Sequence, residues 1–270
     1  MSKGYILITG SAGLIGSEAV EFFSKKGFGI IGIDNNFRKK FFGIRGSTLK
    51  RKNELKLIRR YKHFDYDIRN TPKIERIFRT YKSKIKCIIH CAAQPSHDWA
   101  MKDPILDFDI NARSTLNLLM FFKKYCPEAS FINLSTNKVY GDNPNKLDIR
   151  EMVTRFEVSK KSKYFKKGID ESMSLDNCTH SFFGSAKLSS DMYVQEFGKN
   201  LKLNTVTFRG GCLTGENHSS VELHGFLSYI VKTLINNKPY NVFGYKGKQV
   251  RDNIHSSDLI NCFWEYFKKP

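Results

Sequence analysis

The sequence predicts an α/β fold built on a doubly wound parallel sheet, and three observations support this prediction. Short apolar runs alternate with segments of helical periodicity along most of the chain. A glycine-rich turn joins the first apolar run to the first helical segment. At 270 residues the chain can bury a large core, as one α/β domain or as a domain with an added lobe.

The expected strands are short apolar runs, of which Tyr5–Thr9 is the first. In chain order they cover residues 5–9, 29–33, 62–65, 86–91, 130–135 and 203–208. The expected helices have apolar side chains at helical spacing, as Ile15, Ala19, Phe22 and Phe23 do. In chain order they cover residues 14–26, 72–82, 105–125, 184–199, 222–236 and 257–267.

Two segments interrupt this alternation. Residues 37–60 form a basic insertion between the second and third strands, which we expect to be partly helical. Residues 142–182 form a long polar excursion that contains the basic run 160–167. Excursions of this length are either functional lids or flexible segments, and both interpretations stay open.

The composition favours a protein without nucleic-acid, membrane or metal partners. The formal net charge is +19, but the basic residues are scattered, which is typical of solvated faces. The six cysteines show no CxxC pair, and Cys87 and Cys91 share one face of a predicted strand, which indicates core packing. No apolar run is long enough to cross a membrane, and no signal peptide precedes the first strand. We therefore expect a reduced, cytoplasmic protein whose positive field favours anionic substrates.

The turn after the first strand carries glycines at positions 10, 13 and 16. Gly10, Gly13 and Gly16 would let the backbone turn sharply, approach a pyrophosphate and pack the helix on its strand. The amides of the helix N-terminus would then face the anion. Asp34 ends the next apolar run, roughly 20 residues past the loop, where a ribose-binding carboxylate belongs. The full context favours dinucleotide binding over an ordinary tight turn.

We expect the chain to contain two parts. Residues 1–210 should form a Rossmann domain, and residues 211–270 a small, truncated C-terminal substrate lobe interleaved with the last strands. The chain ends at Pro270, just after a predicted helix and without a closing element. A fragment of a longer protein is therefore one interpretation.

Further candidate residues follow the later strands, at the sheet edge where ligands bind. Asp67 follows the third strand and is either an acceptor for an adenine amino group or an acid that caps a helix or a turn. His97 follows the fourth strand and is either a proton carrier or a hydrogen-bonding loop residue. Thr136 ends the fifth strand, where a hydroxyl can bond a sugar oxygen. Phe183 and Lys187 lie one helical turn apart and share a face.

Together these motifs resemble the extended short-chain dehydrogenases/reductases, in particular the NAD-dependent nucleotide-sugar epimerase/dehydratase group. The glycine loop, the strand end Ser135–Gly141 and the helix with Lys187 carry the general resemblance. Three more specific motifs resemble the CDP-paratose 2-epimerases, also called CDP-tyvelose epimerases. They are Ser135–Gly141, Gly168–Ser172 and Gly247–Asp252.

The resemblance implies NAD as cofactor, because Asp34 would bind the adenosine ribose and its charge would repel a 2′-phosphate. It implies that Thr136 is the catalytic hydroxyl and that Lys187 bonds the nicotinamide ribose. Thr136, Asn137 and Arg251 would bind the substrate, with Arg251 on its diphosphate. The implied cofactor contacts are Gly10, Ala12, Gly13, Leu14, Ile15, Gly16, Asp34, Asn35, Asp67, Ile68, Ala92, Ala93, Gln94, Asn111, Lys187 and Arg209.

One position departs from the family pattern. The family's general base is a tyrosine four residues before the lysine, and Phe183 stands there. A phenyl ring accepts no proton, so three interpretations follow. Another group supplies the base, with His97 ahead of His180 and Tyr140; or the chemistry differs; or the protein binds its ligands without turnover.

The expected function is NAD-dependent epimerisation of a nucleotide-diphosphate sugar through a keto intermediate, with a CDP-linked deoxyhexose as substrate. The alternatives are a 4-epimerase, a 4,6-dehydratase, a sugar reductase or a non-catalytic binding protein. The resemblance also implies a homodimer formed through the helices near 105–125 and 184–199, although core packing alone would explain their apolar stripes.

Overall fold

The computed structural model describes residues 3–219, 221 and 224–270, and its centre is a six-stranded parallel sheet. The strands lie in the order β3-β2-β1-β4-β5-β8, and every neighbouring pair is parallel. This order reverses beside β1, as in a doubly wound Rossmann sheet, so the predicted fold class is confirmed. The strands are β1 (Tyr5–Thr9), β2 (Gly29–Ile33), β3 (Tyr61–Phe64), β4 (Ile85–His90), β5 (Ser130–Thr136) and β8 (Asn204–Gly210). All six predicted strands are present, with boundaries within two residues of the predicted ones.

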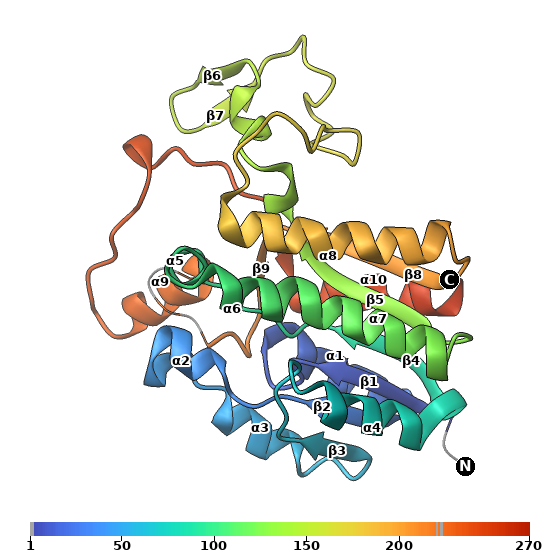
Figure 1. Ribbon diagram of the computed structural model, residues 1–270. Coiled ribbons are helices and arrows are strands. Elements are labelled where there is room, and N and C mark those ends of the chain that lie inside the picture. Colours follow the sequence, from blue (N-terminus) through green and yellow to red (C-terminus); the bar gives the residue numbers. More distant parts are fainter. Residues whose placement is uncertain (1–2, 220, 222–223) are drawn as a thin grey trace.

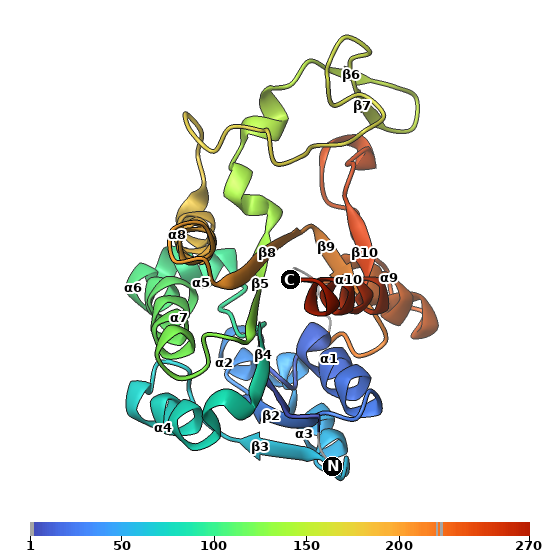
Figure 2. The same ribbon diagram turned by 90° about the vertical axis from the view of Figure 1, so that its right-hand side faces the viewer.

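Helices cover both faces of the sheet (Figures 1 and 2). On one face, α1 (Leu14–Lys25), α3 (Leu49–Leu55) and α10 (Ser256–Lys268) bury apolar side chains against β1 and β4. On the other face lie α4 (Thr71–Tyr81), α6 (Pro104–Phe108), α7 (Ser114–Tyr125) and α8 (Ser181–Lys199). The core therefore consists of two apolar layers that the sheet separates.

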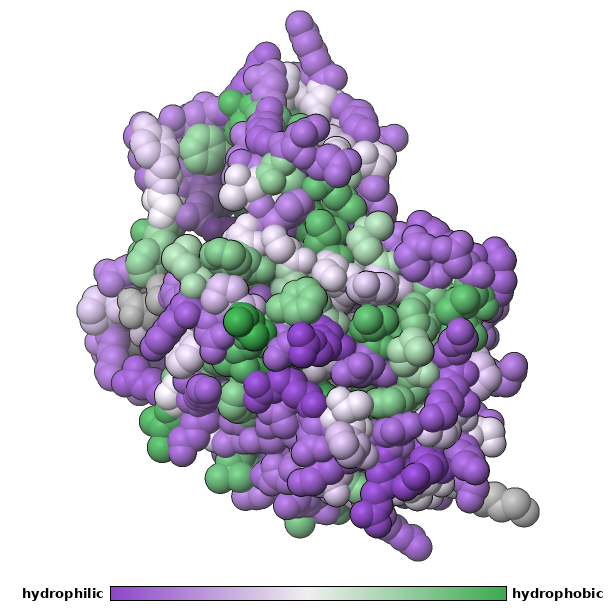
Figure 3. All heavy atoms as spheres, in the orientation of Figure 1, coloured by the Kyte–Doolittle hydropathy of each residue, from purple (hydrophilic) through white to green (hydrophobic). Residues whose placement is uncertain are grey.

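The layer of α6, α7 and α8 also carries apolar side chains on its outer surface. Figure 3 shows green side chains gathered across this side of the molecule. The exposed apolar residues of these helices and of the preceding α5 are Met101, Ile105, Phe108, Met120, Phe182, Met192 and Tyr193.

Several helices differ from their predicted form. The helix expected over 105–125 is divided, because one π-helical turn, Asp109–Arg113, separates α6 from α7. The short α5 (His97–Lys102) was not predicted; the Ser96 side chain caps it by accepting a hydrogen bond from the amide of Trp99. The helix expected over 222–236 is α9 (Phe226–Ile235), and residues 222 and 223 lie outside the described residues.

The basic insertion is partly helical, as predicted. It contains α2 (Arg38–Phe42), one 3₁₀ turn (Ile44–Gly46) and α3. The indole of Trp99 donates a hydrogen bond to the carbonyl oxygen of Phe41, which ties the insertion to α5.

The excursion over 142–182 carries its own small structure. A 3₁₀ turn, Asn143–Lys146, leads to an antiparallel hairpin of β6 (Ile149–Glu151) and β7 (Phe156–Val158). A separate apolar cluster supports it, formed by Val139, Tyr140, Tyr164 and Met173. Figure 1 shows the hairpin beyond the first turn of α8, above the carboxyl edge of the sheet.

After β8 the chain forms a second, two-stranded parallel sheet from β9 (Cys212–Thr214) and β10 (Asn253–His255). Between these strands lie α9 and a 3₁₀ turn, Tyr245–Gly247. The proposed domain boundary at 210 falls at the end of β8. Beyond it, Phe263 of α10 is fully buried and its ring lies 5.1 Å from that of Phe208, so α10 shares the core of the large sheet.

Within the part of the chain that the structure describes, no helix combines the length and apolar character needed to cross a bilayer. The same residues contain no cluster of three or more histidine, cysteine, aspartate or glutamate side chains suited to a metal ion.

Candidate functional site

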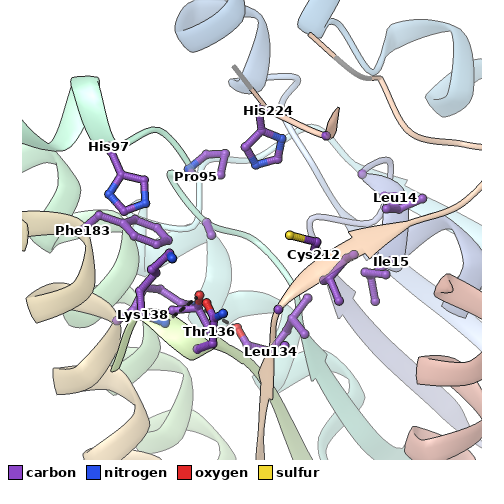
Figure 4. A pocket seen from close by; sticks show the side chains of 18 of the residues that line it. Leu14, Ile15, Pro95, His97, Leu134, Thr136, Lys138, Phe183, Cys212 and His224 are labelled. Carbon is purple, nitrogen blue, oxygen red and sulfur yellow. Dashed lines mark hydrogen bonds between the residues drawn. The ribbon is translucent and has the colours of Figure 1, made fainter. Parts of the chain in front are cut away.

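A large cavity of about 1590 Å³ opens at the carboxyl edge of the sheet. The glycine turn and the ends of β2, β4 and β5 line one part of it, and β9 and the segment before β10 line another. Figure 4 shows labelled side chains that follow β4, from the end of β5 and from β9 around one space. Ligands of doubly wound sheets bind at this edge, where the strand order reverses.

The glycine turn is held tightly against the neighbouring chain. The amide of Gly10 donates to the carbonyl oxygen of Ile33 at 2.8 Å, and Gly10 has a positive φ of 66°. A β-carbon on Gly16 would stand 2.1 Å from the carbonyl oxygen of Gly10. Only glycine therefore fits at position 16 without a shift of backbone.

The N-terminus of α1 is open toward the cavity. Gly13 is its N-cap and provides no capping side chain, and Leu14 and Ile15 line the cavity beside it. The first amides of a helix without a capping side chain are available to an anion, and the helix dipole favours negative charge there. These residues fit the pyrophosphate of a dinucleotide.

Asp34, at the end of β2, is fixed by two backbone amides. Its carboxylate accepts hydrogen bonds from the amide of Ala12 at 3.0 Å and from the amide of Asn36 at 2.8 Å. Burial raises the pKa of Asp34, and the two amides oppose that effect. A carboxylate held at the cavity wall by the glycine turn suits the hydroxyls of a ribose.

Asp67 lines the cavity but is already paired. Its carboxylate accepts bonds from Arg69 Nη2 at 2.7 Å, Nε at 3.0 Å and the Arg69 amide at 2.9 Å. Burial opposes ionisation of Asp67, yet the Arg69 bonds outweigh it and lower its pKa. The N-cap of α4 is Asn70, so Asp67 does not cap that helix. Asn35 and Ile68 lie with Asp67 on the cavity wall.

Four predicted cofactor contacts lie outside the cavity lining. Ala12 is buried behind the glycine turn, and Gln94 and Asn111 are buried together with Asp107. The side-chain amides of Gln94 and Asn111 each donate to Asp107 Oδ1 at 2.8 Å. This network lies next to Ala93, which does line the cavity, as Ala92 does.

Arg209 is the fourth of these residues, and it bonds within the protein. Its guanidinium donates to Asp191 through Nη2 at 2.9 Å and through Nε at 3.1 Å. Nη1 donates to the hydroxyl of Tyr140 at 3.0 Å. The structure thus gives Arg209 an ion-pair role, and its predicted cofactor contact stays a prediction.

Lys187 and Thr136 both reach the cavity where β5 ends. Lys187 Nζ donates to the carbonyl oxygen of Leu134 at 2.8 Å. Burial lowers the pKa of Lys187 to about 8, against the attraction of Asp191. Thr136 follows Leu134 by two residues, and its Oγ1 accepts a hydrogen bond from the amide of Lys138 at 3.3 Å. An amino group and a hydroxyl therefore border the same space.

Phe183 lies beside them, where the sequence pattern calls for a tyrosine. Its ring is 8% exposed, and its centroid lies 4.8 Å from that of the His97 imidazole. Packing of the His97 ring lowers its pKa, and the nearby charge of Lys138 adds to that effect. The predicted proton carrier and the replaced tyrosine position are thus neighbours.

The two weaker candidates for a substitute base are less available. The hydroxyl of Tyr140 is occupied by Arg209, and Tyr140 is outside the cavity lining. His180 lines the cavity, but its Nε2 lies 2.8 Å from the carbonyl oxygen of Leu175.

Arg251 lies at the opposite wall, in the segment before β10. It is exposed, lines the cavity and donates only to the side chain of Gln249. No carboxylate of the described residues pairs with it. Asn137, the remaining predicted substrate contact, also lines the cavity. A guanidinium without an acidic partner, facing such a cavity, fits a phosphate.

Two charged residues of the cavity lining were not among the predicted site residues: Arg38 and Lys138. Arg38 donates to His224 Nδ1 at 3.2 Å and to the carbonyl oxygen of Ser219 at 3.1 Å. Burial lowers its pKa to about 10. Lys138 lies within the motif at the end of β5, so its position two residues after Thr136 was the available signal. Arg38 carried no comparable signal, because its partners His224 and Ser219 come from a distant segment.

Comparisons with known proteins agree with this arrangement. The model of the NAD dependent epimerase/dehydratase family matches residues 6–270. CDP-paratose 2-epimerase of Salmonella typhi is 32% identical over 267 residues, which cover 96% of this chain and 73% of that protein.

Solved structures share the fold. One is dTDP-glucose 4,6-dehydratase of Bacillus anthracis in complex with NAD, with a TM-score of 0.73 at 22% identity; the match covers 98% of this chain and 72% of that one. Another is UDP-N-acetylglucosamine 4-epimerase of Methanobrevibacter ruminantium, with a TM-score of 0.76 at 19% identity; the match covers 99% and 74% of the two chains.

Proposed function

The chain belongs to the NAD dependent epimerase/dehydratase family, and from that membership we propose that it inverts one ring carbon of a nucleotide-diphosphate sugar. Its relatives are NAD-dependent nucleotide-sugar epimerases and dehydratases. The proposed substrate is a CDP-linked deoxyhexose such as CDP-paratose, inverted at carbon 2. The 32% identity to CDP-paratose 2-epimerase supports this choice, together with the motifs Ser135–Gly141 and Gly247–Asp252.

One observation carries the proposal: the glycine turn, Asp34 and Arg251, whose guanidinium has no carboxylate partner among the described residues, line a single cavity. Thr136 and Lys187 line the same cavity. A sugar whose diphosphate is bound by Arg251 would bring a ring hydroxyl toward Thr136.

The chain's own residues then have distinct tasks. NAD, when bound, accepts a hydride from the sugar carbon and returns it. Thr136 would donate a hydrogen bond to the reacting sugar oxygen and hold it in place. Lys187, fixed by the Leu134 carbonyl, would orient the nicotinamide ribose. The enclosing hairpin segment, of which Arg155 lines the cavity, would exclude water.

Phe183 supports a second candidate function. Without a tyrosine hydroxyl, the protein would bind NAD and a nucleotide sugar as a sensor unless another group moves the proton. Within the enzymatic interpretation, His97 and Lys138 are the titratable groups beside Phe183. A 4-epimerase, a 4,6-dehydratase or a reductase would use the same cavity with another sugar.

The test is mass spectrometry of the ligand released from the purified protein, followed by NMR analysis of products. We expect released NAD, and a C2-inverted sugar after incubation with CDP-paratose. Protein that neither carries nor binds NAD would contradict the proposal. Bound NAD without product from any nucleotide sugar would favour the sensor.

Replacing Arg251 by alanine should raise KM for the nucleotide sugar about ten- to a hundred-fold, because a charge-assisted bond to phosphate is lost. The fold should be unaffected, since Arg251 bonds only to Gln249. Arg150→Ala is the matched control, because Arg150 is exposed and outside the cavity lining. Steady-state kinetics of both variants decide the matter; equal KM values would remove Arg251 from the substrate site.

We also propose that the chain forms a homodimer through the outer surface of α6, α7 and α8. This surface exposes apolar side chains, including 75% of Ile105 and 51% of Met120 (Figure 3). Apolar patches of this kind mark interaction sites. Light scattering should give the mass of two chains, and Met120→Glu should reduce it toward one. A wild-type mass of one chain would contradict the dimer.

A further inference from the structure

Transient oxidation of a sugar carbon requires a proton acceptor for the hydroxyl, and Phe183 provides none. Under the proposed function, on which this inference rests, another group must replace the tyrosine. A substitute must line the cavity, lie beside Phe183 and Thr136, and be able to lose its own proton near working pH.

Lys138 meets the first two conditions. It lines the cavity and belongs to the 3₁₀ turn Asn137–Tyr140 directly after β5. Its amide donates to Thr136 Oγ1 at 3.3 Å. A β-carbon on Gly184 would stand 3.1 Å from the Lys138 carbonyl oxygen, so this turn packs on the α8 residue next to Phe183. Figure 4 shows the Lys138 side chain entering the cavity beside Thr136, Phe183 and His97.

The charges around Lys138 meet the third condition. The side chain is half-buried and faces the cation of Arg251, the imidazole of His97 and the thiol of Cys212. Among residues 3–219, 221 and 224–270, no carboxylate lies within ion-pair distance of it. Burial lowers the pKa of Lys138, and the charge of Arg251 lowers it further. The neutral amine is thus reached at a lower pH than in an ordinary lysine.

The competing groups are bonded to other partners or exposed. Tyr140 is bonded to Arg209, and His180 to the Leu175 carbonyl. His97 is exposed at the cavity mouth, and its Nδ1 lies 3.4 Å from Ser181 Oγ. Lys187 is fully buried and bonds to the Leu134 carbonyl, as its ribose-binding task requires.

We propose that Lys138 Nζ, as a neutral amine, takes the proton of the sugar hydroxyl in place of the missing tyrosine. The O–H bond breaks, the amine becomes an ammonium ion, and the oxygen forms a carbonyl. The electron pair of the C–H bond leaves as the hydride that the bound cofactor accepts. On the return, the ammonium gives its proton back to the carbonyl oxygen as the hydride reaches the opposite face.

The variants Lys138→Met and Lys138→Arg test this step. Both should lower kcat by 10²-fold or more, because neither side chain can accept a proton at working pH. The KM for the sugar and the amount of bound NAD should stay within about two-fold of the wild-type values. Such values would also show that the variants fold. Lys160→Met is the matched control, since Lys160 is exposed and outside the cavity lining. The double variant Lys138→Met/Phe183→Tyr should have a kcat at least ten-fold higher than that of Lys138→Met alone.

Two readouts separate a base from a mere positive charge. The wild-type kcat should rise with pH through a pKa below that of an ordinary lysine, because the neutral amine is the active form. When the lysine side chains are ¹³C-dimethylated, the NMR signal that is missing from Lys138→Arg belongs to Lys138. In the wild-type protein without substrate, this signal should titrate with the same lowered pKa.

The outcomes distinguish this inference from the proposed function. A wild-type protein that inverts no nucleotide sugar overturns the proposed function. An active wild type whose Lys138→Arg variant keeps its rate overturns the proton-acceptor role alone. Loss of activity in His97→Ala with full activity in Lys138→Met would assign the proton to His97 instead.

Discussion

Gly16→Ala should abolish NAD retention and destabilise the fold by on the order of 3 kcal/mol. The added β-carbon would stand 2.1 Å from the Gly10 carbonyl oxygen and 2.8 Å from its carbonyl carbon. Both are backbone atoms of the glycine turn, so neither can move without changing the pyrophosphate site. Thermal unfolding and mass spectrometry of the released ligand measure the two effects.

Gly13→Ala is the matched control within the same turn. Gly13 has an ordinary φ of −74°, and a β-carbon there would stand 3.3 Å from the Gly10 carbonyl oxygen. This variant should fold with near-normal stability and lose affinity for NAD, since the methyl group stands at the phosphate site. If Gly16→Ala melts like wild type and carries NAD, the assigned geometry of the turn is wrong.

Arg209→Met should destabilise the protein by about 3–5 kcal/mol at neutral pH. It removes the cation that faces Asp191, whose side chain is fully buried, and leaves an unpaired buried anion. Ser135 and Gln195 still donate to that carboxylate, at 2.6 Å and 2.8 Å, but neither carries charge. Urea unfolding of the variant and the wild type measures the difference.

The pH dependence of this effect has a definite sign. Burial alone would raise the pKa of Asp191, but the bonds from Arg209 and Ser135 hold it below the ordinary value. Its contribution to wild-type stability is therefore present above the unfolded pKa of about 4 and is lost as pH falls through the folded pKa. In Arg209→Met the folded pKa rises instead, so the deficit should shrink as the pH approaches 4.

Arg155→Met provides the control, because Arg155 forms only an exposed ion pair with Glu157 at 3.5 Å. That pair should contribute less than about 1 kcal/mol. Equal losses in the two variants would show that the Asp191–Arg209 pair does not carry the stability assigned to it.

The sheet was predictable because its information is local. The strands β1, β2, β4 and β5 are rich in apolar residues, because side chains such as Ile6, Ile31 and Ile88 are buried in the core. The π-helical turn at Asp109–Arg113 and the hairpin of β6 and β7 carry no such pattern. These two elements depend on contacts with distant segments, which periodicity does not report.

The candidate site was predictable to the extent that its residues lie at strand ends. Asp34 follows β2 and Thr136 ends β5, and both line the cavity where the sheet order places them, whereas Lys187 reaches it from α8. Arg209 also follows from the sheet, at the end of β8, but its partner Asp191 lies on α8 and could not be inferred from spacing. Lys138 was overlooked because its neighbours, Arg251 and His97, are distant in sequence.

In the proposed reaction, one sugar carbon would give a hydride to the bound cofactor and receive it back within the same cavity. Incubating CDP-paratose with the purified protein in deuterated water, followed by NMR of the product, tests this directly. We expect inversion at carbon 2 with protium retained there, because the hydride returns from the cofactor. Deuterium at the inverted carbon would contradict it.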